Sequence, residues 1–140
     1  MKSEIPYRLS VSFPGELDYI PLVRQLVSDA LQVLKFSPKF SFRSEFLVDE
    51  LCNNAVIHGS PSNRQPVEVL CDAYGDRVEI FVKGAGGYQE NIQRFREAIA
   101  EASREKGNDI ELIRLLSDTV TCTIDDNNVS HIHVVRMREC

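Results

Sequence analysis

The sequence predicts a single α+β domain over residues 1–140, in which helices cover one face of a mixed, mainly antiparallel sheet. Three observations support this fold class. Short segments with alternating apolar residues recur along the chain, amphipathic helical patterns separate some of them, and tight turn signals join others. The length of 140 residues, with 43% hydrophobic and 26% charged residues, is typical of one globular domain.

The first half of the chain predicts one strand followed by two helices. Residues 7–13 alternate as a strand, and a helical spacing of apolar residues follows over residues 18–34. The segment Ser37-Pro38-Lys39 is interpreted as a turn. A second helix is expected over residues 44–58 and ends at Gly59-Ser60-Pro61.

The second half predicts two hairpins that flank two helices. Tyr74-Gly75-Asp76 joins the strands of the first hairpin, and residues 125–128 form the turn of the second. Glycines at positions 84, 86 and 87 indicate a turn poor in side chains. The expected elements are strands 66–73 and 77–83, helices 89–106 and 110–117, and strands 119–124 and 129–137.

Composition excludes several classes of function. The formal net charge of −5 and the interspersed acids and bases argue against direct binding of nucleic acid. No apolar run approaches the roughly 18 residues needed to span a membrane, and the N-terminus lacks an apolar signal core, so we expect a cytoplasmic protein. The four cysteines lack C-x-x-C spacing, which favours reduced thiols over zinc ligands or disulfides.

The second helix carries two polar borders beside its apolar stripe. Glu50, Asn54 and His58 follow one border at intervals of four residues, and Asp49 and Asn53 follow the other. A carboxylate one turn from a carboxamide can hold Mg²⁺ and orient an attacking group. Polarity alone does not choose between the borders, and such pairs usually decorate a solvated helix edge.

The stretch Glu-x-x-x-Asn-Ala-x-x-His-Gly at positions 50–59 resembles the N-box of the GHKL superfamily of gyrase-, chaperone- and histidine-kinase-type ATPases. The chain is most similar to bacterial anti-sigma-factor serine/threonine-protein kinases. The resemblance covers nearly the whole chain, including Leu22-Val23-Arg24 on the first helix and Leu112-Ile113-Arg114 on a late one.

This resemblance implies a Bergerat-type ATP-binding fold, a two-layer α/β sandwich, with ATP and Mg²⁺ as cofactors. Glu50 would then be the catalytic base and Asn54 the metal ligand. A sigma factor or an anti-anti-sigma protein would be the partner, with a serine of the latter as phosphoryl acceptor, and the protein would form a homodimer. By motif position, the nucleotide would also be bound by His58, Gly84, Gly86, Gly87 and Gly107.

Two motifs depart from the family pattern. Gly84 stands where the family has an aspartate that accepts a hydrogen bond from adenine, a loss of about 1–3 kcal/mol in binding. Gly107-Asn108-Asp109 retains one glycine of the lid motif, and Asp109 can cap the following helix itself. The alternative is therefore a degenerate protein-binding module that no longer binds ATP or catalyses.

Two other features were considered. His131 and His133 share one face of the closing strand and could hold a metal ion, but no third ligand is evident, which favours an exposed strand face. The catalytic half of a sensor histidine kinase is a weaker alternative, because no helix with a phosphoacceptor histidine precedes the domain in this sequence.

Overall fold

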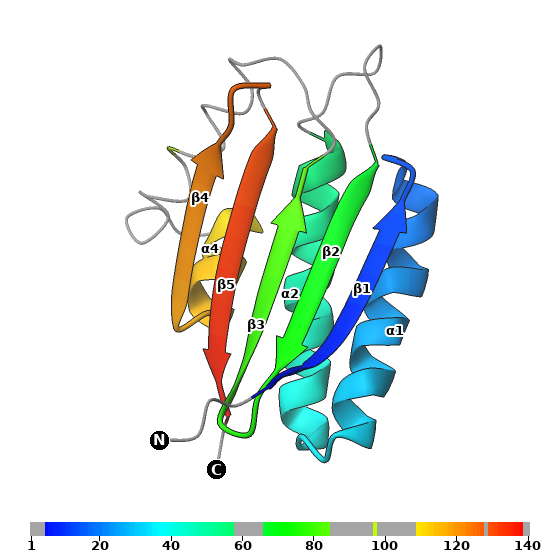
Figure 1. Cartoon of the computed structure of the whole chain (residues 1–140), viewed down its shortest axis with the longest axis vertical. Coiled ribbons are helices and arrows are strands. Elements are labelled where there is room, and N and C mark those ends of the chain that lie inside the picture. The colour runs from blue at the N-terminus through cyan, green and yellow to red at the C-terminus, as the bar shows by residue number, and fades with distance from the viewer. Residues whose placement is uncertain (1–4, 58–65, 85–96, 98–108, 128, 139–140) are drawn as a thin grey trace.

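In a computed structural model, the described part of the chain comprises residues 5–57, 66–84, 97, 109–127 and 129–138. Its strands form one antiparallel sheet in the order β1-β2-β3-β5-β4, and its helices lie on a single face of that sheet (Figure 1). The α+β fold class is therefore confirmed. The strands are β1 (Tyr7–Phe13), β2 (Val67–Ala73), β3 (Arg77–Lys83), β4 (Thr119–Ile124) and β5 (Ser130–Met137). The helices are the 3₁₀ turn η1 (Leu17–Tyr19), α1 (Ile20–Val33), α2 (Pro38–Ile57) and α4 (Asp109–Leu116).

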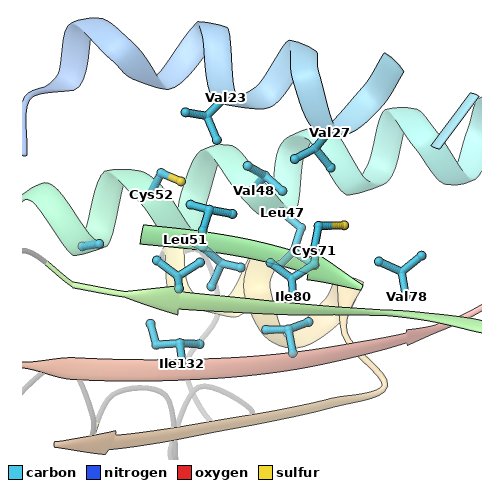
Figure 2. Close-up of a cluster of buried hydrophobic side chains, with 14 of the residues drawn as sticks. Val23, Val27, Leu47, Val48, Leu51, Cys52, Cys71, Val78, Ile80 and Ile132 are labelled. Atoms are coloured by element: carbon cyan, nitrogen blue, oxygen red, sulfur yellow. The ribbon is translucent and has the colours of Figure 1, made fainter. Parts of the chain in front are cut away.

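The hydrophobic core lies between the helices and the sheet. Figure 2 shows side chains of α1 and α2 meeting those of β2, β3 and β5 in one layer. Leu47, Leu51 and Ile80 have no exposed surface, and Ile132 is 2% exposed. Alternate residues of each strand point into this layer because successive strand side chains point to opposite faces.

The end of α1 is closed by hydrogen bonds that turn the chain sharply toward α2. The backbone N–H of Phe36 donates to the carbonyl of Leu31, and that of Lys35 donates to Gln32. Lys35 has a φ of 68°, the left-handed conformation that completes this Schellman motif. Phe36 then stacks on Phe40 of α2 with ring centroids 4.9 Å apart. The two helices consequently run antiparallel.

The predicted start of α2 was wrong by six residues. The sequence interpretation placed a turn at Ser37-Pro38-Lys39, but the helix begins at Pro38. Ser37 is its N-cap, since Ser37 Oγ accepts a hydrogen bond from the Phe40 N–H at 3.0 Å. Proline is favoured at the first helical position because its missing N–H would have no intrahelical partner there.

Arg136 of β5 connects the sheet to two helices from a buried position. Its Nη1 donates to the Phe40 carbonyl at 3.1 Å and to Ser44 Oγ at 2.6 Å. Its Nε donates to the Leu116 carbonyl of α4 at 2.7 Å. The guanidinium also lies 4.3 Å from the centre of the Phe40 ring. A charged group thus joins α2, α4 and β5 inside the domain.

The other predicted elements agree with the structure to within about two residues where they are described, including both hairpins. The helix predicted over residues 89–106 and the end of α2 at Gly59 lie outside the described residues. The described helices include none that is both long and apolar enough to cross a membrane. Cys52 and Cys71 are buried thiols, as expected, and burial raises the pKa of both to about 12.

Candidate functional site

The structure separates the two polar borders of α2 that the sequence left equivalent. Asp49 and Asn53 lie on the side of α2 that faces α1. Arg24 of α1 places its Nη1 3.6 Å from Asp49 Oδ1. Asn53 Nδ2 donates to the Asp49 carbonyl at 2.8 Å and approaches Asp49 Oδ2 at 3.3 Å. This border therefore takes part in the contact between the two helices.

Glu50 and Asn54 lie on the border of α2 that is turned away from α1, because each is more than a quarter turn around the helix from Asp49. Asn54 is only 9% exposed, and its Nδ2 donates to the Glu50 carbonyl at 2.9 Å. That bond fixes the carboxamide and leaves its Oδ1 as the atom that can coordinate a cation. The division into Asn54 as metal ligand and Glu50 as base stays a prediction.

Gly84 and Ser130 form the second part of the candidate site, at the end of β3 and the start of β5. The Gly84 N–H donates to the Ser130 carbonyl at 2.8 Å. A Cβ atom built on Gly84 would collide with Ser130 Oγ. Both residues are buried, with Ser130 only 7% exposed. The Ser130 hydroxyl therefore occupies the space that a side chain at position 84 would need.

Both parts lie at the same end of the molecule. In Figure 1 the C-terminal part of α2, the end of β3 and the start of β5 are all near the top of the view. The Asn54 carboxamide oxygen is of the type that Mg²⁺ accepts, whereas Gly84 offers no acidic acceptor and the Ser130 hydroxyl fills the space beside it. α4 begins at Asp109, one residue before the predicted start of this helix. His58, Gly86, Gly87 and Gly107 lie outside the described residues.

Ser130 was missed by the sequence analysis. It is the first residue of β5, next to the turn, and nothing in its local pattern distinguishes it from other serines. Its role depends on the register between β3 and β5, in which Lys83 pairs with His131. Knowledge of that register alone would have placed Ser130 beside Gly84.

His131 and His133 lie on the sheet face opposite the helices, and each is next to a carboxylate. His131 Nε2 is 2.9 Å from Asp125 Oδ2, and His133 Nε2 is 2.7 Å from Glu79 Oε1. Burial alone would raise the pKa of Glu79, but hydrogen bonds from Arg77 and His133 outweigh it and hold that pKa below its ordinary value. Among the described residues, no three potential ligands gather into a metal site.

Comparison with known proteins supports the fold and identifies the family. A family model for the histidine kinase-like ATPase domain matches residues 13–138. No curated protein gives a significant match. The chain is similar to one chain in the crystal structure of the SiaB–SiaC complex from Pseudomonas aeruginosa, with a TM-score of 0.67. That alignment covers 92% of this chain and 89% of the other at 11% identity, so it supports the fold alone. Because the family model spans nearly the whole sequence, the chain belongs to the histidine kinase-like ATPase domain family.

Proposed function

We propose that this domain is a regulatory protein that binds Mg·ATP beside the C-terminal part of α2 and acts on a protein partner. The observation that carries the proposal is the buried Asn54 carboxamide, held by the Glu50 carbonyl on the border that α1 does not use. A side chain fixed in this way is preorganised to hold a cation.

Glu50 and Asn54 have separate roles in this proposal. Asn54 Oδ1 would hold the cation, and the Glu50 carboxylate would take a proton from the attacking hydroxyl group. Bound ATP would supply the phosphoryl group, with Mg²⁺ offsetting its charge. Arg24 and Asn53 hold Asp49 on the other border, so that carboxylate is engaged in the contact with α1.

A protein substrate fits the comparisons better than a small molecule does. The similar structure from Pseudomonas aeruginosa is a complex of two proteins. The N-box resemblance suggests a sigma factor or an anti-anti-sigma protein as the partner, with a serine as the phosphoryl acceptor. We therefore propose an anti-sigma-like regulator with serine/threonine-protein kinase activity.

One observation favours a second candidate function, a protein-binding module without nucleotide. Gly84 offers no side-chain acceptor to an adenine amino group, and the Ser130 hydroxyl fills the adjoining space. A buried amino group without a partner weakens binding by about 1–3 kcal/mol. In that case the domain would act only by binding another protein through its surface.

Calorimetric titration with Mg·ATP distinguishes the two functions. The proposed kinase should bind saturably in the micromolar range, and Asn54→Ala should weaken binding by at least about tenfold by removing a cation ligand. Asn53→Ala is the matched control, because it removes the same side chain from the other border of the same helix. Glu50→Gln should still bind ATP but lose about 10²-fold or more in its turnover. No heat of binding at millimolar nucleotide would leave the protein-binding module as the function.

A further inference from the structure

The Ser130 hydroxyl is the polar side-chain group next to Gly84 at the end of β3. A Cβ atom on Gly84 would collide with Ser130 Oγ, so the hydroxyl stands where a side chain at position 84 would begin. Ser130 is 7% exposed, and none of the other described residues forms a hydrogen bond with its hydroxyl. This group can therefore bind a ligand or a water molecule.

Two carboxylates approach the same ends of β3 and β5 but lie on the opposite face of the sheet. Glu68 Oε2 is 3.2 Å from Lys83 Nζ, and Asp125 Oδ2 is 2.9 Å from His131 Nε2. Lys83 and His131 are paired across the two strands, and both are exposed, whereas Ser130 is buried. These carboxylates are held by basic side chains, so they do not supply an acidic acceptor beside the hydroxyl.

A hydroxyl group and a carboxylate select different purine bases. Adenine carries an amino group at position 6, which donates a hydrogen bond, and guanine carries an oxo group there, which accepts one. An ionised carboxylate only accepts, so an oxo group opposite it leaves two buried acceptors without a donor. A hydroxyl both donates and accepts. It can turn to bind either group and therefore does not distinguish them.

We propose that the nucleotide site accepts purine nucleoside triphosphates with a 6-oxo group as readily as those with a 6-amino group. This inference rests on the proposed binding of nucleotide and names the substrate class of that site. A carboxylate oxygen of aspartate lies two bonds beyond Cβ, so the Ser130 hydroxyl ends short of that point and a water molecule can bridge it to the base. Such a water donates to an oxo group or accepts from an amino group with equal ease.

Calorimetric titration with the Mg²⁺ complexes of ATP, inosine triphosphate (ITP) and CTP tests the proposal on the full chain. ITP has an oxo group and a protonated N1 where ATP has an amino group and a bare N1. The dissociation constants of ATP and ITP should agree to within about fivefold, a difference of roughly 1 kcal/mol. CTP should bind at least about tenfold more weakly, because its smaller base buries less apolar surface.

The outcomes separate this proposal from the binding of nucleotide itself. A preference for ATP over ITP of about a hundredfold or more would overturn the lack of selection and leave the proposed function intact. Binding of CTP as tight as that of ATP would also overturn it, because the base would then not be recognised. If none of the three nucleotides binds at millimolar concentration, the proposed function fails as well.

Two variants connect the lack of selection to these residues. Gly84→Asp combined with Ser130→Ala introduces a carboxylate and should prefer ATP over ITP by at least about a hundredfold. Ser130→Ala alone should weaken ATP and ITP by a similar factor, about 3- to 10-fold, because the same hydroxyl serves both. Ser12→Ala, at an exposed position on β1, is the matched control and should change neither.

Circular dichroism shows whether each variant is folded before its titration. A folded Ser130→Ala that weakens ATP alone would overturn the proposal, because the hydroxyl would then bind only an amino group. A folded double variant that still binds ATP and ITP equally would overturn it too, since selection would then not depend on the group at this position.

Discussion

Gly84 is the residue on which the proposed nucleotide binding depends most strongly. Its φ lies outside the left-handed region, so its backbone conformation does not require glycine. The constraint comes from Ser130, whose hydroxyl occupies the position of the missing side chain. The site therefore lacks the acidic side chain that the resemblance implies, and the Ser130 hydroxyl occupies the space where that side chain would begin.

Restoring the aspartate requires a change at both positions. Gly84→Asp alone should raise ATP affinity little, because its Cβ meets Ser130 Oγ unless that hydroxyl turns away. Gly84→Asp combined with Ser130→Ala should raise the affinity by roughly 5- to 150-fold, the value of one hydrogen bond to a buried amino group. Calorimetric titration of both variants and of Ser130→Ala alone measures the difference. Equal affinities for the single and double variants would show that the hydroxyl does not obstruct the site.

α2 shows how an element can be predicted in kind but not in extent. The apolar spacing over residues 44–58 correctly indicates a helix, yet Ser37-Pro38 is equally typical of a turn and of a helix start. Tertiary packing distinguishes the two, since Arg136 of β5 lies over the Phe40 ring and donates to the Phe40 carbonyl in the first helical turn. The six added residues include Phe40 and Ser41, both of which are buried.

The N-cap gives this element a measurable contribution to stability. Ser37→Ala should lower the free energy of unfolding by about 1 kcal/mol, because the Phe40 N–H loses its side-chain acceptor. Urea unfolding measured by circular dichroism gives the value. Ser12→Ala, at an exposed position on β1, is the control and should change the free energy by less than about 0.5 kcal/mol. A larger effect at Ser12 than at Ser37 would contradict the assignment.

The whole molecule is held together by one layer of apolar side chains between helices and sheet. Leu51 of α2 points toward the sheet within that layer and has no exposed surface (Figure 2). Arg136 adds a polar connection between the same layers. Because the described helices and strands share this core, we expect them to unfold together.

Leu51→Ala should lower the free energy of unfolding by about 2–5 kcal/mol by leaving a cavity in the core. The transition should remain single, with circular dichroism and the fluorescence of the four tyrosines changing together. Leu115→Ala is the matched control, since Leu115 is 74% exposed. Separate transitions for the two signals would show that the layers unfold independently.

Local pattern was enough to establish the family, the order of the elements and Glu50 and Asn54 as candidates, because each depends on residues close together in the chain. Tertiary structure showed which polar border of α2 contacts α1, since Arg24 of α1 lies against Asp49. It also placed Ser130 beside Gly84, and exposed Phe42 and Phe46 on the outer face of α2. Strand register and helix contacts join residues far apart in sequence, and apolar periodicity carries little information about either.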